Sequence, residues 1–422
     1  MRILYLTHQY YPDCVGGTEL VVRGLVRRMR EKGHVPAVFS FRSTHATNHS
    51  AYGIKRERVE DADVYWFEFN LSQHPNIWEA EYHNRFANYA LRAVLREFRP
   101  DVAHVMHGMK IGGGIYRELH NAGVPIVTVF TDYWFFCLRH TLLLPDGAPC
   151  ISGPEPQERC LDCLLDIHRV PAEMQAGAKE ALAKRNIFLR EVLALSSRLI
   201  ALCEHSARMH ERFGIIGIRV EAHGVETAIL ESALAHRQAH PERQPGAPLR
   251  LLYVGSMVYH KGGHLVIQAI AESSDLPIEF RIVTNVSTMS AYMEKWMGVG
   301  DRRIDWAGPC LPEKIGQHYE WCDALVVPSI WNENALLTFK DALYCGIPVA
   351  AHDLPGLFTH PIGDGWGWKI PTPSVSAWKD WLRDAVEMKT RYMRLDIHVP
   401  TADEFAERMF FHYKEVLHTV KD

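Results

Sequence analysis

Long apolar runs are missing from this sequence. No segment reaches the length of about 18 uninterrupted apolar residues that a membrane-spanning helix needs. The first residues, MRILYLTHQYYPD, enter a strand pattern at once and lack the layout of a secretory signal peptide. Neither sign of charge dominates, because the formal net charge is -4, and a general attraction to nucleic acid is therefore absent. We expect a cytoplasmic globular protein that does not bind nucleic acid.

The patterns along the chain predict two domains of the α/β class. A length of 422 residues is too great for one ordinary core. Short apolar strand patterns alternate with helical patterns, first over 1–200 and again over 250–400, which is typical of parallel sheets covered by helices. We expect residues 201–249 to be an interdomain segment ending in a polar, proline-rich linker over 227–249, and residues 401–422 to contain a final amphipathic helix.

Ligands of open parallel sheets bind beyond the carboxyl ends of the strands, so the residues that follow each strand are the candidates for a site. In a two-domain protein the natural place is a cleft between the domains. After the first strand, Gly16 and Gly17 precede a helix, where they allow a close backbone approach to an anion, although a plain turn explains them equally well. His107 and Asp132 follow two further strands; a lone histidine is more often structural than catalytic.

The second half of the chain carries a lysine at a comparable position. SMVYHKGGHL follows a strand and places Lys261 before two glycines that open a helix. A cation, a flexible backbone and a helix N-terminus together favour phosphate, but the spacing of a Walker A motif is absent. The alternative is a lysine on a solvated surface.

Two carboxylates stand eight residues apart in the stretch WNENALLTFKDALYC. If a helix begins near Ala335, Glu333 lies in the preceding turn and Asp341 lies about two turns in, roughly 9 Å along the axis. A nucleotide diphosphate sugar spans a similar length between its hexose and its ribose, so the two carboxylates can bind the hydroxyls of both. Stabilisation of a helix N-terminus explains Glu333 alone but not Asp341.

Four motifs in this order make the chain similar to the GT-B glycosyltransferases, and specifically to glycosyltransferase family 4. HQYYPDCVGGTE resembles the N-terminal Gly-Gly loop, HGVETAIL the segment before the second domain, VGSMVYHKGG the phosphate loop, and PSIWNENALLTFKDALYCGIPV the E-x7-E motif. The resemblance covers most of the chain. It implies two Rossmann-like domains that face a central cleft, with the C-terminal helix crossing back to the N-terminal domain.

The resemblance also implies a retaining transfer of a sugar from a nucleotide diphosphate sugar, such as a UDP- or GDP-sugar, to a hydroxyl acceptor, without a metal at the reaction centre. Such transfers build polysaccharides, glycolipids or glycosylated metabolites. By position, Lys261 would neutralise the leaving diphosphate, Glu333 would hold the donor sugar and Asp341 would bind the ribose. The remaining expected donor-binding residues are Gly16, Gly17, Gly255, Ser256, Asn334, Ala335 and Leu336.

The sequence departs from the family pattern at three positions. Ser256 follows Gly255 where the family usually has arginine, Thr131 stands where a catalytic-site histidine is common, and Asp341 replaces glutamate. Because a hydroxyl does not accept a proton as an imidazole does, His107 and Asp132 become the candidates for that role. A nucleotide-sugar epimerase of the same fold and a catalytically weakened nucleotide-sugar-binding protein are the alternative functions.

The segment 137–165 is rich in cysteine. Cys137, Cys150, Cys160 and Cys163 end in a C-x-x-C pair, a spacing compatible with a small structural zinc site of four thiolates. Free or redox-active thiols and disulfides are the alternatives.

The first predicted helix, over 18–33, is basic. A helix of this kind can lie on the anionic inner face of a membrane, which would suit a lipid-linked acceptor. The alternative is an ordinary solvated helix face with cations near its C-terminus.

Overall fold

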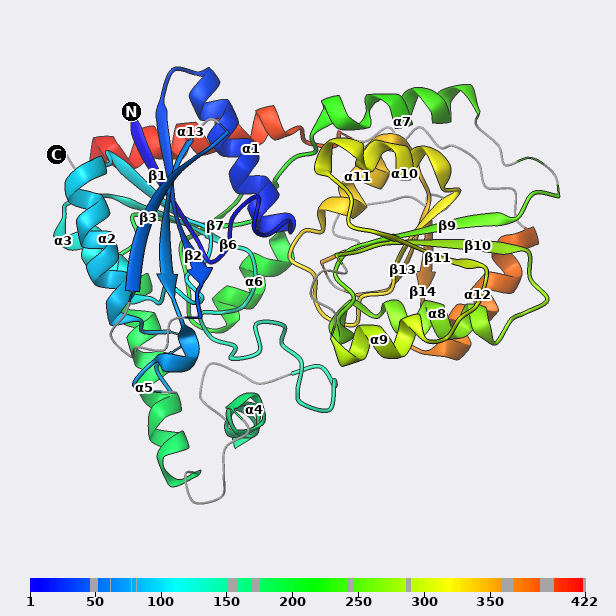
Figure 1. Cartoon of the computed structure of the whole chain (residues 1–422), viewed down its shortest axis with the longest axis horizontal. Coiled ribbons are helices and arrows are strands. Elements are labelled where there is room, and N and C mark those ends of the chain that lie inside the picture. Colours follow the sequence, from blue (N-terminus) through cyan, green and yellow to red (C-terminus); the bar gives the residue numbers. More distant parts are fainter. Residues whose placement is uncertain are drawn as a thin grey trace. The chain divides into compact units, whose positions relative to one another are not determined.

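The computed structural model contains two compact units, each of which is described by itself. The first unit is Met1–His223 together with Ala402–Asp422, and the second is Gly224–Thr401. The structure describes residues 1–45, 52–60, 62–76, 78–80, 82–150, 158–168, 175–240, 244, 246–285, 290–354, 356–357, 367–387 and 398–419. Figure 1 shows the elements of both units.

The first unit is built on an eight-stranded sheet in the order β3-β4-β2-β1-β5-β6-β7-β8. All neighbours are parallel except β3 and β4. The strands are β1 (Arg2–Thr7), β2 (Val35–Ser43), β3 (Tyr52–Val59), β4 (Ala62–Phe69), β5 (Val102–Val105), β6 (Ile126–Phe130), β7 (Arg198–Ala201) and β8 (Ile218–Val220). The described helices are α1 (Gly17–Glu31), α2 (Arg85–Phe98), α3 (Gly114–Asn121), α4 (Glu158–His168), α5 (Gln175–Leu193), α6 (Glu204–Arg212) and α13 (Ala402–Thr419).

Helices cover this sheet, which explains the apolar strand patterns. β5 and β6 are buried at every position, as expected for parallel strands with two covered faces. The helix α2 packs Leu91 and Val94 into the main core, and α1 contacts α13 (Figure 1). Tyr413 of α13 is fully buried and its hydroxyl lies 2.6 Å from His104 Nδ1 in β5. The C-terminal helix therefore returns to the N-terminal unit, as predicted.

The second unit has a six-stranded sheet with the order β11-β10-β9-β12-β13-β14, and every described pairing in it is parallel. Its strands are β9 (Leu249–Val254), β10 (Ile278–Val283), β11 (Ile304–Gly308), β12 (Ala324–Val327), β13 (Val349–His352) and β14 (Gly367–Ile370). Its described helices are α7 (Thr227–Ala239), α8 (Gly263–Ala271), α9 (Ala291–Met297), α10 (Ile315–Trp321), α11 (Leu337–Cys345) and α12 (Val375–Glu387). One core joins the sheet to α8, α9 and α12, and another joins it to α7, α10 and α11. The two sets of helices lie on opposite faces of the sheet (Figure 1).

The expectation of a linker over 227–249 is wrong for its first half. Residues 227–239 form α7, which packs against α10 and α11 within the second unit. Its buried residues are Leu230 and Ala233, three positions apart. Two apolar positions are too few to show the helical periodicity that would have identified this polar segment as a helix from the sequence. Residues 201–223, expected to be interdomain, belong to the first unit, where β8 extends its sheet.

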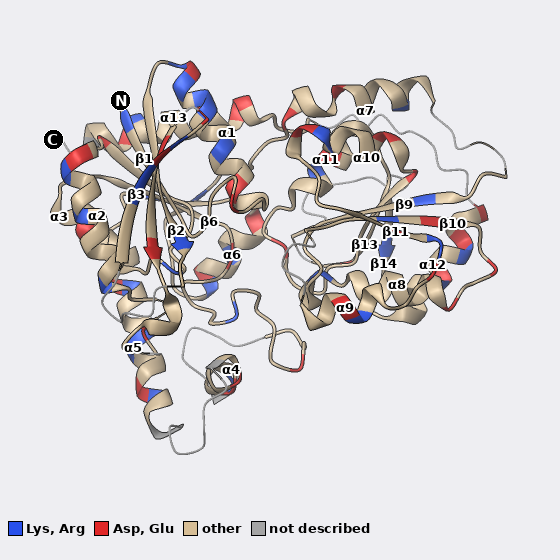
Figure 2. Cartoon of the chain, in the orientation of Figure 1, with Lys and Arg blue, Asp and Glu red and all other residues tan. Residues whose placement is uncertain are grey.

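The basic residues of α1 are largely neutralised by carboxylates of the same unit. Arg28 Nε lies 2.8 Å from Asp403 Oδ1 on α13, and Arg23 pairs with Glu60. Lys32 pairs with Glu407. Figure 2 shows basic and acidic residues mixed along the ribbon. None of the helices in the described part of the chain combines the length and the apolar character that a membrane crossing requires.

Candidate active site

In the second unit, the loop after β9 holds Lys261 beside the end of β12. A short 3-10 turn, Tyr259–Lys261, ends at Gly262, whose φ of 69° is left-handed. A Cβ at Gly262 would lie 1.8 Å from the carbonyl oxygen of Pro328, so only glycine allows this approach of the two segments. The N–H of Ile330 donates to the carbonyl oxygen of His260 at 2.9 Å and joins the same segments. The position of Lys261 is therefore set by backbone contacts.

The structure brings Lys261 and Glu333 together. Lys261 Nζ donates to both carboxylate oxygens of Glu333, at 2.7 and 3.0 Å. Oε1 of Glu333 also accepts from Ser329 Oγ at 2.6 Å and from Trp331 Nε1 at 2.8 Å. Glu333 is only 3% exposed, whereas the Lys261 side chain is 21% exposed. The Glu333 carboxylate is thus held in place by buried hydrogen bonds, and the Lys261 ammonium group that it binds is still partly exposed to solvent.

The three residues after Glu333 form the approach to α11. The side chain of Asn334 is buried, and within the described residues neither its amide nitrogen nor its oxygen has a hydrogen-bond partner. Ala335 adopts a φ of 114°, a region that L-residues rarely occupy. The helix begins at Leu337, two residues after Ala335, with Leu336 as its N-cap. A buried, unpaired amide beside strained backbone marks this turn as a place where a polar ligand fits.

Asp341 lies about one turn into α11, and not two, because the helix starts later than expected. The rise from Leu337 to Asp341 is about 6 Å. The Tyr319 hydroxyl of α10 donates to Asp341 Oδ2 at 3.1 Å. Burial raises the pKa of the Asp341 carboxyl to about 7, although the Tyr319 hydrogen bond acts against the shift. The structure keeps Asp341 on the helix of the E-x7-E motif, where its Oδ2 accepts the Tyr319 hydrogen bond.

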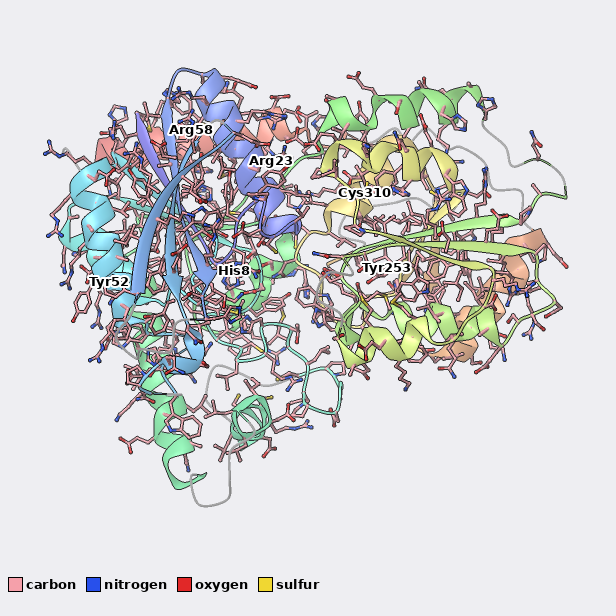
Figure 3. All side chains as sticks on the ribbon, viewed as in Figure 1. His8, Arg23, Tyr52, Arg58, Tyr253 and Cys310 are labelled. Atoms are coloured by element: carbon pink, nitrogen blue, oxygen red, sulfur yellow. The ribbon has the colours of Figure 1, made fainter. Side chains whose placement is uncertain are left out.

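Gly255 and Ser256 form the turn directly after β9. Gly255 has a φ of 153° and donates its N–H to the carbonyl oxygen of Val283 at 3.1 Å. Ser256 is exposed, and its carbonyl oxygen accepts from the Tyr253 hydroxyl at 2.8 Å (Tyr253 is labelled in Figure 3). Gly255 and Ser256 make these contacts with backbone atoms, so the contacts do not depend on the side chain at position 256.

Sequence reasoning missed the residues that support Glu333. Ser329 donates to Glu333 with its side chain, and its carbonyl oxygen lies 2.8 Å from His352 Nδ1. His352 Nε2 accepts from Trp378 Nε1 at 2.9 Å, which leaves Nδ1 as the protonated nitrogen. Ser329 comes two residues after β12, and this strand-end position was the available signal. The partnership with His352 joins separate elements and has no signal in the sequence.

In the first unit, Gly16 and Gly17 stand where α1 begins. Gly16 is the N-cap and Gly17 is the first helical residue. A Cβ at Gly16 would lie 2.5 Å from Glu19 Oε2, so glycine leaves room for that side chain. Glu19 is 3% exposed, and burial raises its pKa. The Gly-Gly turn therefore encloses a carboxylate that the sequence analysis did not single out.

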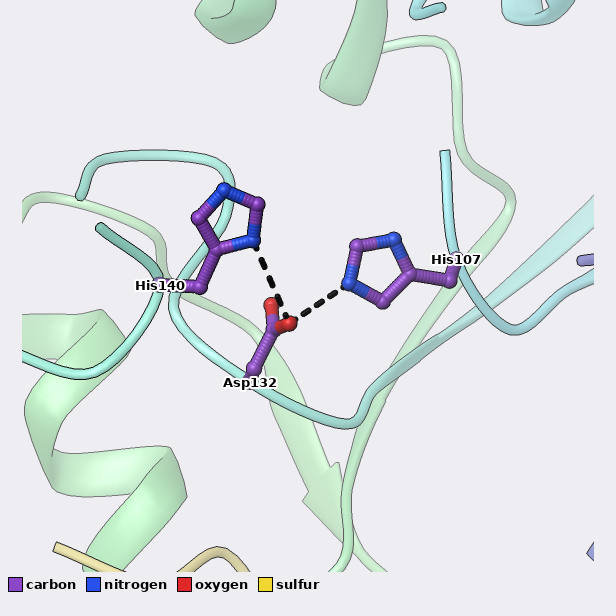
Figure 4. A group of neighbouring side chains, drawn as sticks. All are labelled: His107, Asp132 and His140. Carbon is purple, nitrogen blue, oxygen red and sulfur yellow. Dashed lines mark hydrogen bonds and ion pairs between the residues drawn. The ribbon is translucent and has the colours of Figure 1, made fainter. Parts of the chain in front are cut away.

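His107 and Asp132 meet at the ends of β5 and β6, as Figure 4 shows. His107 Nε2 donates to Asp132 Oδ2 at 2.6 Å, because its Nδ1 accepts the N–H of Met109 at 3.0 Å. His140, on the loop after β6, places Nδ1 3.7 Å from the same carboxylate oxygen. Burial alone would raise the pKa of Asp132, but the two histidines hold it well below its usual range.

His8 extends this cluster from the end of β1 (Figure 3). Its ring centroid lies 4.4 Å from that of His107, and its Nε2 lies 3.7 Å from Glu19 Oε1. Burial, together with the charges of His107 and Lys110, lowers the pKa of His8 well below its usual value. The sequence pattern indicates His107 and Asp132 but gives no signal for His8 or His140. His140 lies within the cysteine-rich segment, where the cysteines alone had drawn attention.

The described residues contain one group whose side chains offer three metal-ligand atoms within 4.8 Å of one another. It is the cluster of His107, Asp132 and His140. The nitrogen that His107 turns toward this group already donates to Asp132, so the arrangement is satisfied by hydrogen bonding alone. The cysteines at 137, 150, 160 and 163 also belong to the first unit.

Comparison with known proteins places this fold and these motifs in one family. The model of Glycosyltransferase Family 4 matches residues 15–229, slightly more than half of the chain, and the model of Glycosyl transferases group 1 matches residues 248–387. No curated protein matches the sequence.

Solved structures agree with this fold over the whole chain. A sucrose-phosphate synthase from Thermosynechococcus elongatus is 15% identical, with a TM-score of 0.65 and 99% of both chains covered. The catalytic domain of starch synthase IV from Arabidopsis thaliana, bound to ADP and acarbose, is 16% identical, with a TM-score of 0.63 and 99% of both chains covered. Anabaena HepE in complex with UDP-glucose is 15% identical, with a TM-score of 0.59, covering 100% of this chain and 98% of its own. The chain belongs to Glycosyltransferase Family 4 and is a glycosyltransferase of the GT-B fold.

Proposed function

We propose that the protein transfers a sugar from a nucleotide diphosphate sugar to a hydroxyl group, with retention of configuration at the anomeric carbon. The observation that carries the proposal is the Lys261–Glu333 pair at the end of β12, next to the side-chain amide of Asn334, which has no hydrogen-bond partner within the described part of the chain. A buried carboxylate holds a cation that still meets solvent, and an unsatisfied polar group lies beside them. This is a suitable place for an anion attached to a hydroxyl-rich group.

The leaving diphosphate defines the main electrostatic task of the reaction. When the bond between the anomeric carbon and the phosphate oxygen breaks, the bonding electrons leave with the diphosphate, and its negative charge increases. Lys261 stabilises that charge, and the backbone N–H groups of residues 334–336 donate to the phosphate and the sugar. Glu333 holds Lys261 in position and accepts hydroxyls of the donor sugar. Asp341 accepts the ribose hydroxyls with the oxygen that Tyr319 does not occupy.

As the acceptor hydroxyl attacks the anomeric carbon it loses its proton, and the departing diphosphate oxygen, which gains the bonding electrons, takes that proton up. In the first unit, Asp132 is ionised, because its pKa is held low, and it orients His107 through Nε2. We assign this cluster to the acceptor hydroxyl, with Asp132 as the anionic acceptor of a hydrogen bond and His140 as its second neighbour. In this assignment the cluster performs the role of the histidine that is common at position 131 in the family. The Thr131 hydroxyl itself donates to the carbonyl oxygen of Met106 at 3.4 Å. The reaction needs no metal ion in this assignment.

UDP- and ADP-sugars are the first donors to test, because two of the similar structures hold UDP-glucose and ADP. An alcohol of a growing polysaccharide, a glycolipid or a small metabolite fits the acceptor role equally well. A membrane-bound acceptor gains little support from α1, because Arg28 and the C-cap residue Lys32 already pair with carboxylates of α13.

The test is a turnover assay with a panel of nucleotide sugars, in which release of the nucleoside diphosphate is measured with and without added alcohols. We expect release with one class of donor and an unchanged anomeric configuration in the product, read by proton NMR. Asp132→Asn should reduce transfer more than donor binding. Interconversion of nucleotide sugars without an acceptor would support the epimerase instead. Binding without turnover on any acceptor would support a nucleotide-sugar-binding protein.

A further inference from the structure

A chain of hydrogen bonds runs from the helix α12 to the turn that carries Glu333. Trp378 of α12 donates its Nε1–H to His352 Nε2 at 2.9 Å, and His352 Nδ1 lies 2.8 Å from the carbonyl oxygen of Ser329. Ser329 Oγ donates to Glu333 Oε1 at 2.6 Å. All four residues are buried, each at most 3% exposed. The chain is shielded from water, so its hydrogen bonds are stronger than they would be at the surface.

The two partners of His352 leave its imidazole only one arrangement of protons. A carbonyl oxygen only accepts, so Nδ1 carries the proton that is donated to Ser329, and an indole N–H only donates, so Nε2 is unprotonated. Burial lowers the pKa of His352, although the hydrogen bond to Ser329 acts against this shift. Trp378 therefore keeps the imidazole neutral, with its proton directed at the carbonyl oxygen of Ser329.

That carbonyl oxygen belongs to a peptide group that contacts both sides of the candidate site. The N–H of the same peptide group is that of Ile330, and it donates to the carbonyl oxygen of His260 at 2.9 Å. His260 directly precedes Lys261, whereas the side chain of Ser329 reaches the carboxylate of the pair. Because a peptide group is planar, its carbonyl and its N–H turn together. The hydrogen bond from the imidazole therefore orients the segments that carry both members of the pair.

The two oxygens of Glu333 are held unequally. Oε1 accepts from Ser329 Oγ, from Trp331 Nε1 and from Lys261 Nζ. Within the part of the chain that the structure describes, Oε2 accepts from Lys261 alone, at 3.0 Å. The rotation of the carboxylate is therefore set at Oε1, where Ser329 makes the shortest of the three bonds. A shift of Ser329 would turn the carboxylate and move the ammonium group that it binds.

We propose, on the basis of the function proposed above, that His352 and Trp378 are positioning residues for sugar transfer. Through Ser329 they hold Glu333 and Lys261 in the arrangement that the reaction requires. Both act on the pair through intervening groups, His352 through the peptide group and Trp378 through His352. Misplacement of a catalytic group by about 1 Å can lower the rate by about 100-fold, so loss of either hydrogen bond should reduce kcat.

The experiment compares Trp378→Phe with Trp381→Phe, three positions further along α12. Both indoles are buried, but among the described residues Trp381 Nε1 has no hydrogen-bond partner. Both substitutions replace an indole by a phenyl ring in the same core, whereas only the first removes a bond of the chain. With saturating donor, nucleoside diphosphate release should show a kcat lowered about 10- to 100-fold in Trp378→Phe and close to that of the wild type in Trp381→Phe.

Two substitutions of His352 separate the proton that it donates from the space that it fills. The side-chain amide of His352→Asn takes the place of Nδ1 and can still donate to Ser329, whereas the amide of His352→Gln reaches the place of Nε2. The asparagine variant should keep more of the wild-type kcat than the glutamine variant, even if urea unfolding finds the two equally stable. This comparison also gives the answer if Trp378→Phe fails to fold.

A double substitution links the chain to the carboxylate. In a Glu333→Gln background, Trp378→Phe should have little further effect on kcat, because residues that act as a unit are not additive. A full further loss in that background would overturn the proposal, as would equal kcat in the two folded tryptophan variants or in the two histidine variants. None of these results would contradict the proposed function. That function fails, and the proposal with it, if the wild type releases no nucleoside diphosphate from any donor.

Discussion

Replacement of Lys261 by methionine should separate the contribution of the Lys261–Glu333 pair to stability from its contribution to catalysis. Methionine keeps most of the stem and its packing near Trp331, whose ring centroid lies 5.0 Å from Lys261 Nζ, but it removes the charge. Glu333 then keeps two donors, Ser329 and Trp331, and loses its cation. Loss of one partner of a fully buried pair costs about 3–5 kcal/mol. Because the Lys261 side chain is 21% exposed, we expect a loss of about 2 kcal/mol in the free energy of unfolding.

The loss of activity should be larger than this loss of stability suggests. If Lys261 stabilises the leaving diphosphate, its removal should lower kcat about 100- to 1,000-fold, the usual effect of deleting one such electrostatic group. Urea unfolding measures the first quantity and nucleoside diphosphate release under saturating donor measures the second. Lys314→Ala, at an exposed lysine of the same unit, is the matched control and should change neither.

A double-mutant cycle with Glu333→Gln completes this prediction. The two substitutions should be coupled in stability by about 1 kcal/mol or more, because each side chain is a direct partner of the other. The reasoning is refuted if the folded Lys261→Met variant keeps kcat within a few-fold of the wild type. It is also refuted if Glu333→Gln restores that activity, because the lysine would then act only as a counter-ion.

Three further predictions concern pH and backbone geometry. His104 is fully buried, with a pKa of about 3 in the folded protein against 6.5 when unfolded, so between these pH values the unfolded state binds more protons. The free energy of unfolding should therefore decrease by about 1.4 kcal/mol for each unit by which the pH is lowered below 6.5. Urea titrations of His104→Gln from pH 7.5 to 5 should lack this part of the slope, and an unchanged slope would contradict the reasoning. The pKa of Asp341 is raised to about 7 from 3.8, which means that burial penalises its charged form. Asp341→Asn should therefore be more stable than the wild type at pH 8 but not at pH 4, and equal stability at pH 8 would count against the burial argument. The same variant should bind the donor more weakly, as measured by calorimetry. Gly262→Ala should lower the free energy of unfolding by several times the roughly 1–2 kcal/mol expected for Gly308→Ala. Both glycines have a positive φ, but only a Cβ at Gly262 would collide with a backbone oxygen. Similar unfolding midpoints for the two variants would argue against this close approach.

The order of strands and helices was predictable where patterns are strong. The stretches RILYLT, HVPAVFS and ALVVPSI are apolar strands between polar flanks, and the structure has strands there, within a few residues. The helix of residues 227–239 escaped because its only buried residues are Leu230 and Ala233. β3 escaped as well: it is an edge strand with mostly exposed or half-exposed positions, so an apolar pattern is weak there.

The sequence predicted the main residues of the candidate site but not the neighbouring residues that hold them in position. Lys261 and Glu333 follow two neighbouring parallel strands, so their meeting follows from the fold. His140 joins the Asp132 cluster through a loop whose path no local pattern specifies. The start of α11 at Leu337 also has no clear signal, because Leu336 offers no side-chain cap and Ala335 adopts a positive φ.

Donor binding to the wild type and to Lys261→Met, measured side by side, tests the central claim most directly. UDP-, ADP-, GDP- and dTDP-sugars would each be added at increasing concentration, and the thermal unfolding midpoint recorded. The account predicts that one class stabilises the wild type, by about 2.7 kcal/mol at a hundred times its Kd, and that Lys261→Met loses most of this gain. Absence of stabilisation by every donor, or equal stabilisation of both proteins, would contradict the donor site at Lys261 and Glu333.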